Sequence, residues 1–383
     1  MNCTDEVGPQ AVSWSPLQTP YYLLDEQALA RNLAVVDRVR AESGAKAVLA
    51  LKCFATWAVF PLLREHLDGT TSSSLFEARL GHEEFGKEVH AYSVGWSRPE
   101  ILEVRTFADA VILNSLSQFH QFRADVEEAG VEIGLRVNPG VSHSHFDLAD
   151  PARRFSRLGA TDLDEVLAIA DSLAGVMFHF NCENTDARSI AESVDHLTRR
   201  FGPLLDRLSW VSLGGGISFT SPGYDVDGLC STLSTFAARH GVQVYLEPGE
   251  AVVTGTAELV TTVLDVVHNE VDVAIVDASV EAHMLDHLIY STSPSLASPA
   301  PGSHRVMVAG RTCLAGDVFG DYHLERPLSV GDEVRIADAA GYTMVKKNWF
   351  NGVAMPSIAV RRLDGRVELV REFGFDDYRR SLS

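Results

Sequence analysis

Short strand-like runs alternate with amphipathic stretches through the first two thirds of the 383-residue chain. Several connecting segments, such as 56–67, 74–85 and 189–208, place apolar residues at helical spacing. The runs lie at 46–51, 69–74, 89–93, 110–114, 132–137, 175–180, 210–215 and 243–248. About eight strand-then-helix units predict an α/β fold, a parallel (β/α)8 barrel. A doubly wound sheet is the rival, but a count of eight favours the barrel.

The pattern changes after about residue 255. Strand-like runs at 257–279, 303–312, 331–339 and 356–374 follow one another with turns and no helical segments between them. This pattern predicts a second, antiparallel β domain built as a sandwich or barrel. We therefore expect a barrel over 20–255 and a β domain over 256–383, with residues 1–19 packing on the latter. The Ser-, Pro- and Ala-rich segment 291–303 is expected to be an exposed loop.

Charge and composition narrow the possible partners. Asp and Glu number 52 against 32 Lys and Arg, a formal net charge of -20, which argues against a nucleic-acid partner. No apolar run is long enough to span a bilayer, and the first 16 residues show no signal-peptide pattern. Five scattered cysteines without a C-x-x-C pair favour a reducing cytoplasm.

Four chemically distinctive features come directly after predicted barrel strands. They are Lys52, His179, the triplet Gly214, Gly215 and Gly216, and Glu247. Because the carboxyl ends of barrel strands meet on one face, these groups should converge there. Each has an ordinary explanation alone: a charged strand end, a structural histidine, a tight turn and a capping acid.

Together the four features meet the needs of pyridoxal 5'-phosphate. An amine can form an imine with its aldehyde, and glycine amides can hold its phosphate. An imidazole can lie flat against its ring, and a carboxylate can keep its pyridine nitrogen protonated. A protonated ring accepts the electrons left when a substrate loses CO2.

Longer stretches of the chain resemble a known family. They include 50–81, "FHFNCE" (178–183), "LGGG" (213–216), "VYLEPGEAV" (244–252), "TCLAGDVFGDY" (312–322), "YTMVK" (342–346) and "FNG" (350–352). From residue 19 to the last residue, the chain resembles the alanine-racemase-fold group of pyridoxal-phosphate decarboxylases, which includes ornithine and diaminopimelate decarboxylases. Within that group it most resembles the carboxynorspermidine and carboxyspermidine decarboxylases.

The resemblance implies specific roles. Lys52 would carry the cofactor, His179 would stack on its ring, and Glu247 would pair with its pyridine nitrogen. Tyr342 would join the three glycines at the phosphate. Cys313 would return a proton after loss of CO2, entering the site from a partner subunit, so a homodimer is implied. A small buried filler is the commoner fate of a cysteine.

A carboxylated polyamine substrate is cationic, so its pocket should present acids. Candidates for substrate contact are Asp277, Asp286, Asp317 and Glu183, with His283 and Arg157 as neighbours on family grounds. Any of the acids could instead be a surface carboxylate, and Arg157 could be a structural ion-pair partner. The product would be norspermidine or spermidine.

The chain departs from the family pattern at several places. Glu250 follows Glu-Pro-Gly where ornithine-type relatives have an arginine, as expected of the carboxynorspermidine branch. Segment 287–303, the "ISFTS" after the glycines and "AGRTC" before Cys313 differ from that branch. Because of these differences, a related decarboxylase with a different substrate, such as another basic amino acid or a diamine adduct, is the alternative.

Other functions explain fewer of these residues. A racemase of this fold would pair the pyridine nitrogen with an arginine, which Glu247 opposes. A noncatalytic pyridoxal-phosphate carrier would not need the second domain. Hydrolysis by Glu247 and Glu250 would leave Lys52 unexplained. The "HSHFD" at 143–147 has metal-ligand spacing, but a polar loop is the simpler interpretation and no metal is predicted.

Overall fold

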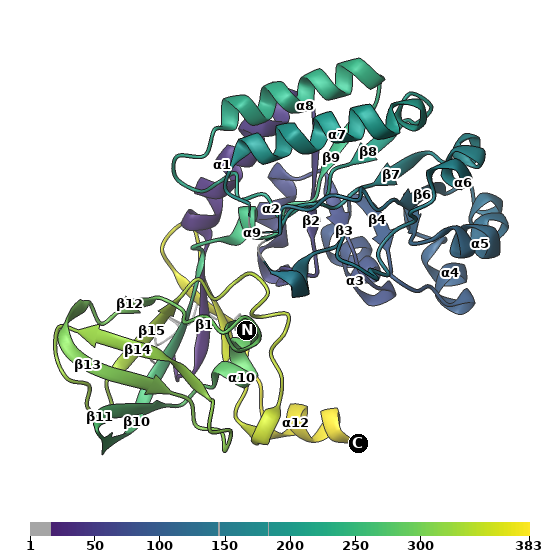
Figure 1. Ribbon diagram of the computed structural model, residues 1–383. Helices are drawn as coiled ribbons and strands as arrows, with labels where there is room; N and C mark the ends of the chain where they lie inside the picture. Colours follow the sequence, from purple (N-terminus) through teal and green to yellow (C-terminus); the bar gives the residue numbers. More distant parts are fainter. Residues whose placement is uncertain (1–16, 145, 183) are drawn as a thin grey trace, which may run out of the picture.

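The computed structural model describes residues 17–144, 146–182 and 184–383, which form two lobes (Figure 1). The larger lobe is a closed barrel of eight parallel strands, which confirms the predicted fold class. Each of the eight predicted runs overlaps a barrel strand. The strands are β2 (Lys46–Ala50), β3 (Gly69–Thr71), β4 (Glu88–Tyr92), β5 (Ala110–Leu113), β6 (Glu132–Arg136), β7 (Gly175–Met177), β8 (Trp210–Ser212) and β9 (Gln243–Leu246).

Helices surround this barrel and bury their apolar faces against the strands (Figure 1). They are α1 (Glu26–Ser43), α2 (Phe60–His66), α3 (Leu75–Leu80), α4 (Arg98–Val104), α5 (Leu116–Glu128), α6 (Leu163–Ala168), α7 (Ala187–Leu205), α8 (Val226–His240) and α9 (Glu250–Val253). Local sequence sets the limits of the helices. The Asp25 carboxylate accepts the Gln27 N–H at 2.8 Å at the start of α1, and Gly44 ends that helix at φ 72°.

A large aromatic side chain fills the end of the barrel where the strands begin, which is called the lower end below. The Trp210 indole lies over Gly134 and Gly175, where a Cβ at Gly175 would lie 2.0 Å from the ring, so only glycine fits. The indole N–H donates to Glu132 Oε2 at 2.8 Å. The interior is therefore closed by packing at this end.

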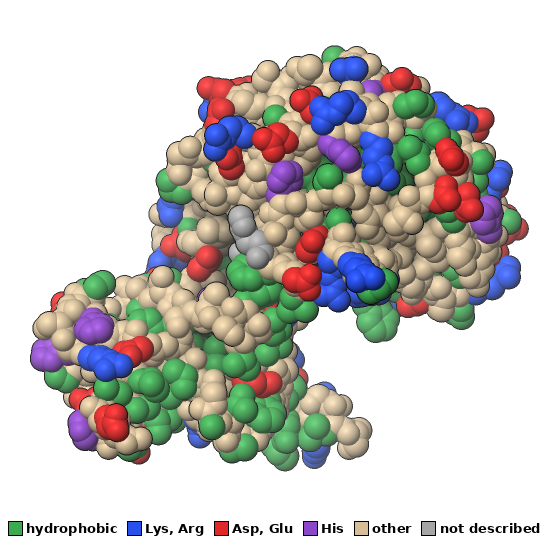
Figure 2. Space-filling view, in the orientation of Figure 1, with side chains coloured by type: hydrophobic (Ala, Val, Ile, Leu, Met, Phe, Trp, Pro, Cys, Tyr) green, Lys and Arg blue, Asp and Glu red, His purple; other side chains and the backbone are tan. Residues whose placement is uncertain are grey.

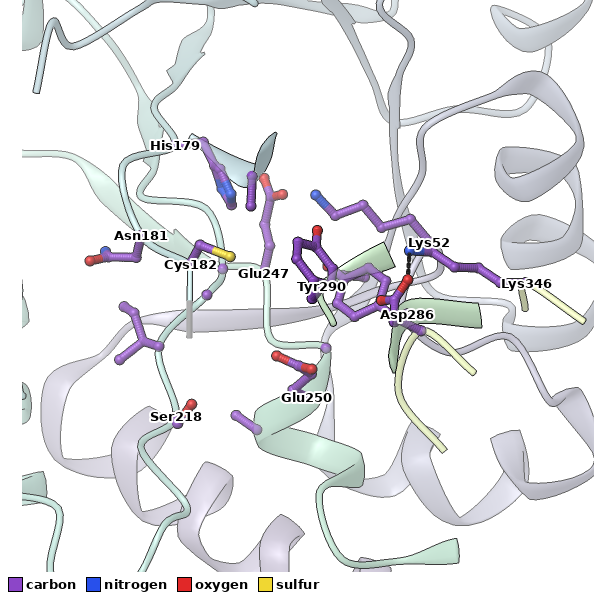
Figure 3. Close-up of a pocket in the computed structure, with 18 residues that line it drawn as sticks. Lys52, His179, Asn181, Cys182, Ser218, Glu247, Glu250, Asp286, Tyr290 and Lys346 are labelled. Carbon is purple, nitrogen blue, oxygen red and sulfur yellow. Dashed lines mark hydrogen bonds and ion pairs between the residues drawn. The ribbon is translucent and has the colours of Figure 1, made fainter. Parts of the chain in front are cut away.

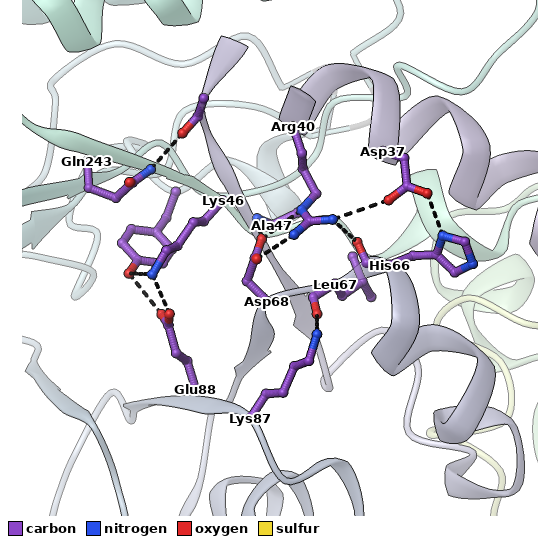
Figure 4. A network of polar contacts seen from close by, with 12 residues as sticks. Asp37, Arg40, Lys46, Ala47, His66, Leu67, Asp68, Lys87, Glu88 and Gln243 are labelled. Atoms are coloured by element: carbon purple, nitrogen blue, oxygen red, sulfur yellow. Dashed lines mark hydrogen bonds and ion pairs between the residues drawn. The ribbon is translucent and has the colours of Figure 1, made fainter. Parts of the chain in front are cut away.

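Polar contacts join the strands around the same end (Figure 4). Lys46 pairs with Glu88, whose other oxygen accepts the Tyr245 hydroxyl at 2.8 Å. Beside them, Arg40 Nε donates to Asp68 Oδ2 at 2.8 Å, and the same oxygen accepts the Ala47 N–H. These contacts stabilise the end of the barrel opposite the predicted site.

The smaller lobe is a nine-stranded sheet. Its strands are β1 (Tyr21–Asp25), β10 (Ala257–Asn269), β11 (Val271–Val276), β12 (Leu296–Ser298), β13 (Pro301–Ala309), β14 (Val318–Leu324), β15 (Glu333–Ala337), β16 (Ser357–Arg361) and β17 (Val367–Arg371). Strand β1 lies here although its residues fall within the predicted barrel range, because it pairs with β10 and β16. Residues 1–16, predicted to pack on this lobe, lie outside the described part of the chain.

Three details of the smaller lobe correct the sequence-based picture. The sheet is mixed, since β1 runs parallel to β16 and β11 runs parallel to β13. Helices α10 (Val280–His283), α11 (Leu285–Ile289) and α12 (Phe375–Leu382) interrupt a region predicted to lack them. The predicted loop 291–303 includes β12, which is short enough to escape a pattern search and pairs with β15. Figure 2 shows the lobes meeting at a waist, with hydrophobic side chains gathered over the smaller lobe.

Candidate active site

A cavity of about 170 Å³ opens at the carboxyl ends of the barrel strands, where the second lobe covers them (Figure 3). Barrel residues on its wall include Lys52, His179, the second and third glycines of the triplet, and Glu247. The second lobe contributes Asp286, Tyr290, Tyr342 and Lys346. The cavity therefore brings together residues that are nearly 300 positions apart in the sequence.

Lys52 follows β2 and extends its amine toward Glu247 (Figure 3). The side chain is exposed to the open cavity, which it lines. Desolvation within the cavity lowers the pKa of Lys52, although the Glu247 carboxylate acts in the opposite direction. A lowered pKa increases the neutral fraction of the amine, which is the nucleophilic form.

Glu247 directly follows β9 and is buried, with 7% of its surface exposed. The hydroxyl of Ser212, at the end of neighbouring β8, donates to Glu247 Oε1 at 2.6 Å. The same hydroxyl oxygen accepts the Gly214 N–H at 3.2 Å. This bond orients the carboxylate into the cavity while leaving its second oxygen available to a ligand.

His179 follows β7 and lies beside Glu247 in the cavity (Figure 3). Burial, reinforced by the positive charges of Lys52 and Arg136, lowers the pKa of His179 well below its usual value. The imidazole is therefore neutral at physiological pH. A Cβ at Gly214 would lie 2.5 Å from His179 Nδ1, so the ring can occupy this place only beside a glycine.

The glycine turn makes a narrow cradle next to these side chains. Gly214 and Gly216 have φ of 71° and 76°, a conformation that favours glycine. Added Cβ atoms at Gly215 and Gly216 would lie 2.3 Å from the carbonyl oxygens of Glu247 and Asn181. Backbone that approaches so closely and carries no side chains suits a bound phosphate.

Tyr342 also lines the cavity and comes from the second lobe. Its backbone N–H donates to the Cys53 carbonyl oxygen at 2.9 Å, which ties the second lobe to the loop carrying Lys52. Burial raises the pKa of Tyr342 well above its usual value, so the phenol keeps its proton and can donate a hydrogen bond.

Cys313 lies outside the cavity lining. Its side chain is exposed, and its N–H donates to Asn351 Oδ1 at 2.7 Å in a separate surface recess. Within one chain it therefore does not reach the cavity that holds Lys52.

The predicted substrate contacts occupy different places. Asp286 lines the cavity and forms an ion pair with Lys346 (Figure 3). Asp277 is buried under the sheet, where burial raises its pKa and one carboxylate oxygen accepts the Thr262 N–H at 3.0 Å. Asp277 is not part of the cavity lining, and Glu183 lies outside the described residues.

Asp317 is also buried away from the cavity lining. Its carboxylate accepts the Thr312 hydroxyl at 2.6 Å, the Thr312 N–H at 3.0 Å and the Val280 N–H at 2.8 Å. These bonds shape the turn that leads to Cys313. A carboxylate so fully engaged by its own chain is poorly placed to receive a substrate amine.

His283 and Arg157, the two remaining predicted neighbours of the site, do not line the cavity. His283 is buried, with its Nδ1 accepting the Ser279 N–H at 3.1 Å, and burial lowers its pKa to about 3. Arg157 has an exposed side chain, and its carbonyl oxygen accepts a hydrogen bond from Asn114 at 2.9 Å. Their predicted roles stay predictions.

Sequence reasoning missed four residues at the site: Ser212, Arg136, Lys346 and Tyr290. Arg136 ends β6 and donates to the Tyr92 hydroxyl at 2.9 Å below the cavity, so its strand-end position was a usable signal. Tyr290 comes from the altered segment 287–303 and contacts Phe146, with ring centroids 5.1 Å apart. Nothing in the local sequence marks Lys346 or Tyr290 as facing a cavity.

The residues fit pyridoxal phosphate by their chemistry. The cavity offers an amine with a lowered pKa, a buried carboxylate with one oxygen held, a neutral flat imidazole and a glycine cradle. In the described residues, no group of three His, Cys, Asp or Glu side chains could hold a metal ion. No described helix is long and apolar enough to cross a membrane.

Comparisons with known proteins agree with this cofactor. Residues 226–340 match the family described as pyridoxal-dependent decarboxylase, C-terminal sheet domain. The crystal structure of carboxynorspermidine decarboxylase complexed with norspermidine from Campylobacter jejuni superposes with a TM-score of 0.85 at 34% identity, covering 94% of this chain and 99% of that one. The fold and the site together define a pyridoxal phosphate-dependent decarboxylase.

Full-length relatives narrow the assignment. The carboxynorspermidine/carboxyspermidine decarboxylase of Herminiimonas arsenicoxydans is 55% identical, covering 96% of this chain and 100% of the relative. The carboxyaminopropylagmatine decarboxylase of Synechocystis is 37% identical over 96% of both chains. The chain belongs to the family of carboxynorspermidine/carboxyspermidine decarboxylases.

Proposed function

We propose that this enzyme removes the α-carboxylate of carboxynorspermidine or carboxyspermidine to give norspermidine or spermidine. The observation that carries the proposal is the convergence of Lys52, Glu247 and the glycine cradle on one cavity beside Asp286. Similarity over the full length to enzymes named for these substrates supports it.

The chain's residues would divide the work. Lys52 would hold the cofactor covalently and yield its place to the substrate amine. Pyridoxal phosphate, when bound, supplies an electron-accepting ring that stabilises the carbanion left by loss of CO2. Glu247 would hold a proton on the ring nitrogen, with Ser212 fixing the orientation of the carboxylate. A charge held in advance where electron density develops lowers the barrier.

The remaining cofactor contacts would fix its position. His179 would lie against the ring face, and its neutrality avoids a cation that would compete for electron density. Gly214, Gly215 and Gly216, with the Tyr342 phenol, would bind the phosphate. A fixed ring keeps the bond that breaks in the orientation where its electrons enter the ring system.

Substrate recognition would rest on acids facing the cavity, of which Asp286 is placed best. Since the 37% identical relative is named for a carboxylated agmatine derivative, a guanidinium-bearing substrate is the second candidate. Tyr290, from the altered segment, would help set the length of the substrate accepted.

We further propose a homodimer in which Cys313 of one subunit completes the cavity of the other and returns the proton to the substrate carbon. The exposed position of Cys313, outside its own cavity, supports this arrangement. Four free cysteines among the described residues support a working location in the reducing cytoplasm.

The deciding experiment is a substrate panel. Purified enzyme with pyridoxal phosphate is given carboxynorspermidine, carboxyspermidine, carboxyaminopropylagmatine, ornithine, lysine and diaminopimelate in turn, and CO2 and amine are measured. We expect turnover of at least one of the first two to exceed that of the others. Preference for ornithine, lysine or diaminopimelate would overturn the proposal.

A further inference from the structure

The cavity contains an ion pair made entirely by the protein. Asp286 belongs to α11, whereas Lys346 lies in the turn after Tyr342, and the two side chains pair inside the cavity (Figure 3). Both are partly buried. Lys52 and Lys346 are the only lysine or arginine side chains among the described residues of the cavity wall. Lys346 is therefore a second ammonium group held within the site.

This pairing has a consequence for ligand binding. A substrate cation approaching Asp286 meets a carboxylate already bound to an ammonium. We propose that Lys346 is an internal occupant of the amine-binding position, and that a cationic nitrogen of the substrate replaces it on Asp286. The inference rests on the proposed function, since it requires a substrate that carries an additional cation.

The surroundings of Lys346 allow such an exchange. Its Nζ lies over the Tyr342 ring, 5.2 Å from the centroid, so the released ammonium has a favourable aromatic face nearby. Glu250 lines the same cavity and adds negative charge there. A displaced Lys346 would thus remain in an acidic, partly solvated environment, and the cost of breaking the pair is limited.

The exchange would act as a selectivity filter. A tethered ammonium competes at a high effective concentration, so amines that bind Asp286 weakly are excluded. A polyamine with several cationic nitrogens gains contacts elsewhere in the acidic cavity and can overcome the competition. Lys346 is on this account a specificity-determining residue that opposes binding.

The test is calorimetric titration of spermidine into the holoenzyme. Lys346→Met should bind spermidine about threefold to tenfold more tightly than the wild type, because the internal competitor is gone and a partly exposed ion pair is worth about 1 kcal/mol. Lys347→Met is the matched control. This substitution removes a lysine one residue further on, outside the cavity lining, and it should leave the affinity for spermidine unchanged.

A second pair of variants locates the effect at Asp286. Asp286→Asn should weaken spermidine binding at least about tenfold. When Lys346→Met is added to the Asp286→Asn variant, the affinity for spermidine should not increase, because the carboxylate for which Lys346 and spermidine compete is gone. Lys346→Gln provides a second neutral side chain if Lys346→Met does not fold.

The inference would be overturned if Lys346→Met and Lys346→Gln both bound spermidine no more tightly than the wild type. It would also be overturned if these variants lost their pyridoxal phosphate absorbance after gel filtration. The latter would show that Lys346 holds the cofactor. The failure of the proposed function has a different signature, because the wild type would then release no CO2 from carboxynorspermidine or carboxyspermidine.

Discussion

The hydroxyl of Ser212 donates a 2.6 Å hydrogen bond to the carboxylate of Glu247, joining the ends of β8 and β9 at the floor of the cavity. A hydrogen bond to an ionised acceptor is short and strong, and it fixes the plane of the carboxylate. Glu247 is therefore held in one orientation before any ligand arrives.

Ser212→Ala should impair catalysis without preventing cofactor binding. We expect kcat/KM to fall about fivefold to thirtyfold, the equivalent of about 1–2 kcal/mol for a charged hydrogen bond whose loss frees the carboxylate to rotate. Steady-state kinetics on the preferred substrate, with cofactor content measured by absorbance, checks this. Ser218→Ala, which removes a hydroxyl elsewhere on the cavity wall, is the control. Equal effects of the two variants would contradict the role of Ser212.

Gly214→Ala should abolish tight cofactor binding. The new Cβ would meet the His179 ring at 2.5 Å, in addition to the cost of about 1 kcal/mol for a side chain at positive φ. Gly223→Ala separates these two effects, because Gly223 has φ 81° but open space around its Cβ position. The control should lose only stability in thermal unfolding. If Gly214→Ala retained cofactor as well as the control does, the cradle would not be the phosphate site.

Two inactive variants should complement each other in a mixed dimer. Lys52→Ala and Cys313→Ala are each expected to lose clean decarboxylation. If Cys313 enters from the partner, randomly mixed dimers have about one quarter of their sites intact, so about one quarter of wild-type activity should return. The activity of refolded equal mixtures measures this.

Lys52→Ala mixed with Gly214→Ala is the control for this experiment. Both changes alter the same barrel cavity, so no mixed dimer has an intact site and no recovery is expected. Recovery in neither mixture would show that Cys313 does not act from the partner subunit.

Glu88 should contribute to acid stability. Burial raises its pKa, but the His90 imidazole 3.6 Å away and the hydrogen bonds from Lys46 and Tyr245 outweigh that effect and hold the pKa at about 2, below the ordinary 4.5. Because the folded pKa is the lower one, the contribution is fully present above about pH 4.5 and is lost as the pH falls toward 2. Glu88→Gln should therefore flatten the pH dependence of the free energy of unfolding across this range.

Urea unfolding followed at several pH values measures that slope. Glu83→Gln, at an exposed position on the barrel surface, gives the comparison. A wild-type slope in Glu88→Gln would show that the polar network at the lower end of the barrel is unimportant for acid stability.

The barrel was predictable because each strand–helix unit is a local pattern, and the parallel arrangement then forces the strand ends together. This logic is sufficient to bring Lys52, His179 and Glu247 to one place before any coordinates are known. Contacts between distant segments carry no such local mark. The pairing of β1 with β10, and the position of Lys346 opposite Asp286, depend on how the second lobe docks.

The mixed sheet shows the same limit. A strand pattern indicates that residues are extended, but strand direction depends on neighbours chosen by the whole fold. Asp317 is instructive, since its sequence context suggested a ligand contact. Its burial and its hydrogen bonds to Thr312 and Val280 instead give it a place in the framework of the turn.

The Trp210 indole closes the lower end of the barrel, so it also determines where substrate and products can enter and leave the cavity. A sealed base leaves a blind-ended chamber, so substrate, carbon dioxide and polyamine must all use the opening beneath the second lobe. The polyamine product must therefore leave through this opening before the next substrate can enter.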